Sequence, residues 1–112
     1  MKKSSELTKN EKFKLINEGD NFDKEVEKIF CCDLLSIAMG RAPAGSAWVT
    51  VMANINTFAV ATLADVSCVI IAEGMDIDEV TLEKAKEKGI TLFSTEEPVY
   101  EAALLAKETF EL

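Results

Sequence analysis

Beyond residue 46, the hydrophobic positions of the chain alternate between two kinds of spacing. Short apolar runs at Ala47–Met52, Cys68–Ala72 and Ile90–Ser94 predict strands, and the continuous run at Cys68–Ala72 is typical of a strand buried on both faces. After the first and third runs, apolar residues recur every three or four positions, which predicts helices. These residues are Ile55, Phe58, Ala59, Leu63 and Val66, and later Val99, Ala102, Ala103, Ala106 and Phe110.

A helix is also predicted between the second and third strands. Asp76–Glu79 fits a capping box with Asp76 as N-cap, and Gly89 fits the position just after the last turn. The final helix is predicted to begin near Thr95–Pro98, because proline is tolerated in a first turn. The order strand–helix, repeated three times, predicts a parallel sheet with right-handed crossovers and helices packed on its faces.

The first 46 residues carry weaker signals. We expect a short helix near residues 4–10, a strand at Phe13–Asn17 and a second strand at Glu25–Cys31. Asp33 is then predicted to cap a short helix that ends near Gly40. The elements together predict a single three-layer α/β domain over residues 1–112, with a mostly parallel sheet and helices on both faces. Its N-terminal segment, 1–24, pairs with or covers one side of a core formed by 25–112.

Composition excludes several classes of function. The chain has 112 residues, 48% of them hydrophobic, which suits one domain with a real core. The net charge of −8 opposes non-specific nucleic-acid binding. No apolar run approaches the ~20 residues of a membrane-spanning helix, and the N-terminus lacks the apolar region of a signal peptide. The sequence therefore predicts a cytoplasmic protein that binds neither nucleic acid nor membrane.

The residues needed for common catalytic chemistry are missing. There is no histidine, which removes Ser-His and Cys-His relays and the commonest metal ligand. There is no phosphate-binding G-x-x-x-x-G-K-[ST] loop. Cys31, Cys32 and Cys68 lack the spacing of a zinc site and are predicted to be buried reduced thiols, with a redox role for Cys31 or Cys32 as the alternative. We expect no enzyme activity, no metal and no cofactor.

Two stretches carry a resemblance to a known family. "CDLLSIAMGRAPAGSAWVTVMANINTFAVATLADVSCVIIAEG" (Cys32–Gly74) and "TLEKAKEKGITLFST" (Thr81–Thr95) resemble the small stand-alone DRTGG-domain proteins. These are similar to the N-terminal domain of HPr kinase/phosphorylase, and related domains occur in CBS-containing pyrophosphatases and phosphotransacetylases. The resemblance implies an α/β fold, a regulatory role and dimerisation. The kinase activity of HPr kinase belongs to a separate catalytic domain that this sequence lacks.

The sequence departs from the family pattern at two turns. Many relatives carry a Gly-Asp-Arg-like triplet after the first of the three strands, where this chain has "ANIN" (Ala53–Asn56). The Thr-Gly-Gly-like turn that follows the next strand is replaced here by Ala72, Glu73 and Gly74. A ligand site in this chain must therefore use other groups.

The turns at Ala53–Asn56, Glu73–Met75 and Ser94–Glu96 follow three parallel strands, so they meet at the carboxyl edge where α/β sheets bind ligands. A helix N-terminus there can also bind an anion. The candidate ligand-binding residues are Asn54, Asn56, Thr57, Glu73, Gly74, Ser94 and Thr95. Simpler alternatives remain: Asn54 or Asn56 only caps the helix, Glu73 is solvated and repels anions, and Gly74 only supplies an unusual backbone conformation.

Three further residues are candidates for an interface between protein chains. Asp33 lies in the "DLL" shared with relatives, Arg41 is the only arginine, and Trp48 is the only tryptophan. The simpler alternatives are that Asp33 is an N-cap, that Arg41 is a solvated loop residue and that Trp48 belongs to the core.

The sequence thus predicts a non-catalytic regulatory or adaptor domain. We expect a homodimer that acts through protein contact or by sensing a small ligand. The alternative is a domain that binds an adenine nucleotide at the carboxyl edge, and a small enzyme with unusual chemistry comes last.

Overall fold

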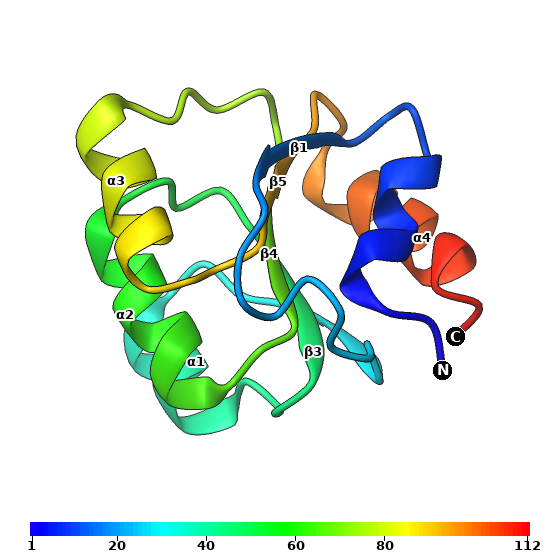
Figure 1. Ribbon diagram of the computed structural model, residues 1–112, viewed down its shortest axis with the longest axis horizontal. Helices are drawn as coiled ribbons and strands as arrows, with labels where there is room; N and C mark the ends of the chain where they lie inside the picture. Colours follow the sequence, from blue (N-terminus) through cyan, green and yellow to red (C-terminus); the bar gives the residue numbers. More distant parts are fainter.

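A five-stranded sheet forms the middle layer of the computed structural model, which describes residues 1–112. Figure 1 shows helices on either side of this layer. The strand order is β1-β5-β4-β3-β2. Strands β2 to β5 are parallel to their neighbours, and β1 runs antiparallel to β5. The strands are β1 (Lys14–Asn17), β2 (Lys28–Cys31), β3 (Ser46–Thr50), β4 (Cys68–Ile71) and β5 (Leu92–Ser94).

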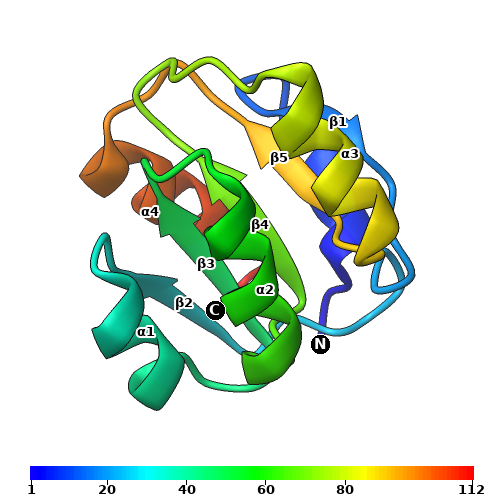
Figure 2. The ribbon, with the colours of Figure 1, turned by 90° about the vertical axis from the view of Figure 1, so that its left-hand side faces the viewer.

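Helices cover both faces of this sheet. One face carries α1, α2 and α3, and the other carries α4 and the 3₁₀ helix η1 (Figures 1 and 2). The helices are η1 (Ser4–Lys9), α1 (Leu35–Arg41), α2 (Ile55–Ala64), α3 (Glu79–Glu87) and α4 (Val99–Thr109). This is the three-layer, mostly parallel α/β arrangement that the sequence predicts. None of the helices is long and apolar enough to span a bilayer.

Two hydrophobic clusters, one on each face of the sheet, form the core. Along β4, Cys68 and Ile70 face α4, whereas Val69 and Ile71 face α1, α2 and α3. All four are fully buried. Successive strand residues point to opposite faces, so a strand covered on both sides must be apolar throughout. This confirms the prediction made from the continuous apolar run.

Two predicted helix caps are wrong. The N-cap of α3 is Asp78, whose Oδ1 accepts a hydrogen bond of 2.8 Å from the Thr81 amide, and not Asp76. Asp33 does not cap α1, because the N-cap position falls on Leu34, which makes no capping hydrogen bond. The predicted end of α3 is confirmed, since Gly89 has a φ of +67° in the left-handed region that glycine tolerates.

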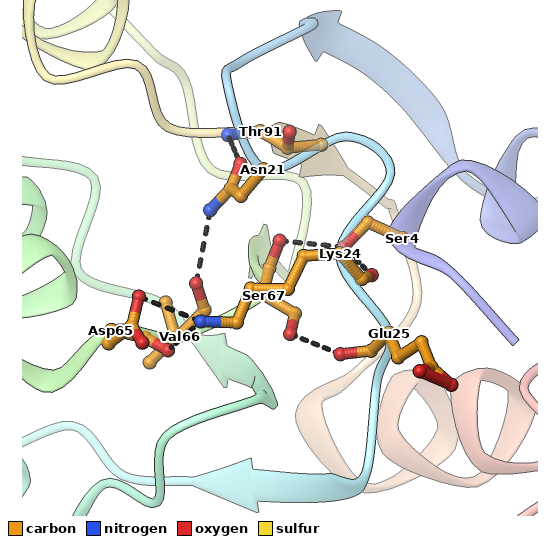
Figure 3. Close-up of polar contacts among 8 residues, drawn as sticks. All are labelled: Ser4, Asn21, Lys24, Glu25, Asp65, Val66, Ser67 and Thr91. Carbon is orange, nitrogen blue, oxygen red and sulfur yellow. Dashed lines mark hydrogen bonds and ion pairs between the residues drawn. The ribbon is translucent and has the colours of Figure 1, made fainter. Parts of the chain in front are cut away.

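Polar side chains attach the N-terminal segment to the amino ends of β4 and β5 (Figure 3). The Ser4 hydroxyl donates to the Ser67 carbonyl at 2.6 Å, and the Ser67 hydroxyl donates to the Glu25 carbonyl at 2.6 Å. Asn21 joins the two strands, since its amide group donates to the Val66 carbonyl at 3.0 Å and accepts from the Thr91 amide at 2.8 Å. These contacts hold the segment against the sheet and leave β1 paired with β5.

Candidate functional site

A cavity of about 570 Å³ lies at the carboxyl edge of the sheet. It is bounded by β1 and the turn before it, by the loop between β4 and α3, by α3, and by the end of β5. Figure 2 shows α3 beside β1 and β5, with the long β4–α3 loop passing above them. The volume lies within the roughly 300–1,000 Å³ of small-molecule sites.

Three of the predicted ligand-binding residues line this cavity: Gly74, Ser94 and Thr95. The Thr95 hydroxyl donates to the Lys12 carbonyl at 2.8 Å and accepts from the Glu97 amide at 3.2 Å. The Gly74 amide donates to the Thr95 carbonyl at 3.0 Å. Gly74 has a φ of +64°, which explains why glycine occupies this bend. These bonds join the turn after β5 to the turn before β1 and to the loop between β4 and α3.

Glu73 is exposed, which agrees with the solvated alternative, and it also makes a contact that the sequence does not predict. Its carboxylate Oε2 accepts a hydrogen bond of 3.0 Å from the Val99 amide, 26 residues away. Its own amide donates to the Glu97 carbonyl at 2.9 Å. The side chain therefore caps the N-terminus of α4, which Pro98 at the N-cap position cannot do with a side chain of its own. Glu73 is not among the residues that line the cavity.

This distant cap leads to a stability prediction. Glu73→Ala is expected to lower the free energy of unfolding by about 0.5–2 kcal/mol, the usual cost of losing a capping side chain. Glu73→Gln keeps an oxygen that can accept the bond from Val99 and is expected to lose less. Urea unfolding followed by circular dichroism measures both variants. Equal losses in the two variants would contradict the capping role.

The three candidates near "ANIN" lie outside the cavity. Asn54 is the N-cap of α2, and its Oδ1 accepts from the amides of Asn56 at 3.0 Å and Thr57 at 3.3 Å. Thr57 is fully buried, and its hydroxyl donates to the Met52 carbonyl at 2.7 Å. Asn56 is exposed. The geometry favours the capping alternative for this turn.

Trp48 belongs to the core and not to an interface. Its side chain is fully buried on the face covered by α1, α2 and α3. The indole Nε1 donates to the Cys32 carbonyl at 2.9 Å, and the Phe30 ring lies 6.4 Å away between ring centroids. The interface prediction for Trp48 is therefore wrong, because the helices on this face of the sheet cover its side chain completely.

The other two interface candidates are exposed, close to the two ends of α1. Asp33 joins the segment before α1 to the end of β3, since its Oδ1 accepts from the Thr50 hydroxyl at 2.7 Å and the Val51 amide at 2.9 Å. Arg41 forms the last turn of α1. It has no carboxylate within 4.0 Å.

The cysteines differ in exposure. Cys68 is buried and Cys32 is partly buried, but Cys31 is exposed on β2, which corrects the prediction that all three are buried. Cys31 is exposed because β2 is the last strand of the sheet.

Burial raises the pKa of the Cys68 thiol to about 12. Partial burial and the charge of Asp33 raise the pKa of Cys31. Neither thiol has the lowered pKa of a reactive cysteine.

The N-terminal segment provides a part of the cavity that the sequence does not predict. Lys12, Lys14 and Ile16 line the cavity because β1 pairs antiparallel with β5, with Lys14 opposite Ser94. No local pattern near these residues indicates that pairing. The loop residues Asp76 and Ile77 also line the cavity. The sequence predicts Asp76 as a cap because Asp76 and Asp78 are both chemically able to fill that role.

Comparisons with known proteins show the fold. No protein-family model and no curated protein matches this sequence. A solved structure that does match contains the CBS and DRTGG domains of the regulatory region of the Clostridium perfringens pyrophosphatase, complexed with its activator, diadenosine tetraphosphate. The TM-score is 0.75 at 16% sequence identity, over 94% of this chain and 45% of the other. The likeness supports a DRTGG-like fold for this chain, which spans less than half the length of the clostridial one.

Proposed function

We propose that this chain is a non-catalytic regulatory domain that senses a small ligand at the carboxyl edge of its sheet. The observation that carries the proposal is the 570 Å³ cavity at that edge, in a fold shared with part of a regulatory region. Ligands of open α/β sheets bind beyond the carboxyl ends of the strands, where the loops diverge. The cavity also joins three segments that are distant in sequence, so a ligand bound there would hold them together.

The absence of catalysis is part of this proposal. The sequence has no histidine and no phosphate-binding loop, and the pKa values of Cys31 and Cys68 are raised, not lowered. A cysteine activated as a nucleophile needs a lowered pKa. Turnover of a nucleotide by protein freed of contaminating enzymes would contradict the proposal that the domain is non-catalytic.

An adenine nucleotide is the ligand class with the most support. The clostridial regulatory region was crystallised with an adenine dinucleotide, and the cavity here has room for a nucleotide. A thermal-shift panel of adenosine, AMP, ADP, ATP and inorganic phosphate tests this choice. A ligand at about one hundred times its dissociation constant adds about 2.7 kcal/mol to the free energy of unfolding. The choice of an adenine nucleotide is wrong if no nucleotide raises the melting temperature.

Self-association is the second part of the proposal, and the exposed apolar side chains around α1 support it. Leu34 is 58% exposed, Ile37 45% and Met39 58%, whereas Ala38 is the only fully buried residue of α1. A helix with apolar residues on most of its sides is normally covered. The helix follows β2, an edge strand with a neighbour on one side only.

A second copy of this chain is the occupant that we propose for this surface. Two β2 strands related by a two-fold axis would pair antiparallel and extend the sheet across both copies. Such pairing brings Lys28, at the start of β2 in one copy, toward Asp33, just past its end in the other. The exposed Glu27 precedes Lys28, so this end of the strand carries both signs of charge, and the exposed apolar residues around α1 carry the proposal.

Sedimentation tests the dimer. At micromolar concentration the mass is expected to be about twice the 12.3 kDa of the chain. Ile37→Lys with Met39→Lys is expected to give monomers. Val80→Lys with Leu104→Lys, at two exposed apolar positions on α3 and α4, adds the same charge and is expected to leave the dimer intact. A wild-type monomer would refute self-association and leave contact with a different protein as the adaptor mechanism.

A further inference from the structure

The outer surface formed by α1 and α2 is almost free of charge. From Leu34 to Ala64 the only charged residue is Arg41, although the whole chain has 12 basic and 20 acidic residues. The two helices pack against each other, and Figure 2 shows them side by side on one face of the sheet, with α3 beyond α2. Helix α3, in contrast, carries three exposed glutamates. We call the neutral surface, made of residues 34–41 and α2, the α1–α2 face.

Apolar side chains line the outer side of α2. Ile55, Ala59 and Leu63 are spaced four residues apart, so they lie on one side of the helix. Ile55 is 41% exposed and Leu63 74% exposed, whereas Phe58 and Ala61 are buried in the core cluster on the inner side. A surface helix normally carries charged or polar residues on the side away from the core. The outer side of α2 therefore has the character of a contact surface.

The proposed pairing of β2 strands leaves this side of α2 uncovered. Antiparallel pairing about a two-fold axis perpendicular to the sheet keeps the helices of both copies on the same side of one continuous sheet. Because α1 lies between α2 and the β2 edge, α1 of one copy would meet α1 of the other (Figure 2). The paired copies would then present their two α1–α2 faces next to each other as one neutral surface.

Charge and size indicate which partner fits this surface. Each copy has a net charge of −8, so copies repel each other wherever their acidic residues meet. The α1–α2 face has no acidic residue, so the same face of another copy can approach it with little repulsion. One copy offers only the outer sides of a 7-residue and a 10-residue helix, fewer than the roughly 20–30 residues per side of a stable interface. The doubled surface of a pair comes closer to that size.

We propose that the α1–α2 face is a second self-association surface, through which two β2-paired dimers stack helix layer against helix layer to form a tetramer. This inference rests on the proposed dimer and goes beyond it by assigning a role to the outer side of α2. The contact is isologous, because the same face of each copy takes part. Burial of apolar side chains stabilises it, and the absence of carboxylates keeps the repulsion between copies small.

Sedimentation of the full chain over a range of concentrations tests the inference. The mass is expected to rise from about twice the 12.3 kDa of the chain at micromolar concentration to about four times that mass at millimolar concentration. Leu63→Lys is expected to stay dimeric throughout, because stacking would remove the new charge from water. The matched control is Tyr100→Lys on α4, at a position 71% exposed on the opposite face of the sheet, and it is expected to form the tetramer.

Ionic strength provides a second measurement. Raising it from about 0.1 M to about 1 M shortens the Debye length from about 10 Å to about 3 Å, which screens the repulsion between acidic copies and is expected to favour the tetramer. A tetramer that dissociates in salt would contradict a neutral contact. If the wild type stays dimeric at every concentration, or if Leu63→Lys still forms tetramers, the inference is wrong while the proposed dimer stands. A wild type that stays monomeric would refute both.

Discussion

Trp48→Ala is expected to lower the free energy of unfolding by about 3–5 kcal/mol, as large-to-small substitutions of buried aromatic residues do. Trp48 is the largest fully buried side chain, and it packs in the cluster that contains Ala38 and Phe58. Truncation leaves a cavity beneath α1 and α2 and leaves the Cys32 carbonyl without its indole donor. Small domains have a total stability of about 5–15 kcal/mol, so this loss is a large part of it.

Urea unfolding monitored by circular dichroism measures the effect as a lower midpoint with an unchanged slope. Tyr100→Ala is the control, because Tyr100 is 71% exposed on α4 and its truncation is expected to change stability by no more than about 0.5 kcal/mol. Trp48→Phe keeps one aromatic ring and removes the indole donor and part of the buried volume, so its loss is expected to lie between the other two. Equal losses for Trp48→Ala and Tyr100→Ala would contradict the burial described here.

Gly19→Ala is expected to cost about 1–3 kcal/mol or more, the usual range for overpacking a filled interior. A Cβ at Gly19 would lie 2.3 Å from the Gly89 carbonyl oxygen and 2.5 Å from the Thr91 amide nitrogen. Both atoms belong to the backbone of the turn into β5, so they cannot rotate away as a side chain would. The substitution therefore displaces the segment after β1 from the turn that precedes β5.

Gly40→Ala is the matched control. No atom lies within 4 Å of a Cβ at Gly40, which is in α1. Alanine is favoured over glycine inside a helix by roughly 0.5–1 kcal/mol, so this variant is expected to be as stable as the wild type or more stable. Thermal unfolding of the two variants compares them directly. The close approach at Gly19 would be disproved if both changed the melting temperature equally.

Local patterns predict the second half of the fold well because each element there carries its own signal. The apolar run at Cys68–Ala72 has to be a strand buried on both faces, and the spacing of Ala102, Ala106 and Phe110 places one side of α4 against the sheet. Errors occur at the caps of α1 and α3. More than one residue near each boundary is chemically able to cap, and the choice depends on where the chain leaves the preceding strand.

The candidate site could be predicted only in part. Strand order alone indicates that Gly74, Ser94 and Thr95 share an edge, since parallel strands end together. The role of Glu73 could not be predicted, because its partner Val99 is brought close by the packing of α4. The same holds for Lys12 and Lys14, which reach the cavity through an antiparallel pairing of β1 with β5.

The sequence by itself determined the α/β class, the mostly parallel sheet, the two covered faces and the edge at which a ligand site was to be sought. These follow from hydrophobic spacing and short connections, which are local properties of the chain. Only the tertiary structure decided that "ANIN" serves as a helix cap, that Trp48 is core, and that the cavity has a wall from the N-terminal segment. Those outcomes depend on contacts between residues far apart in sequence, for which local spacing carries no information.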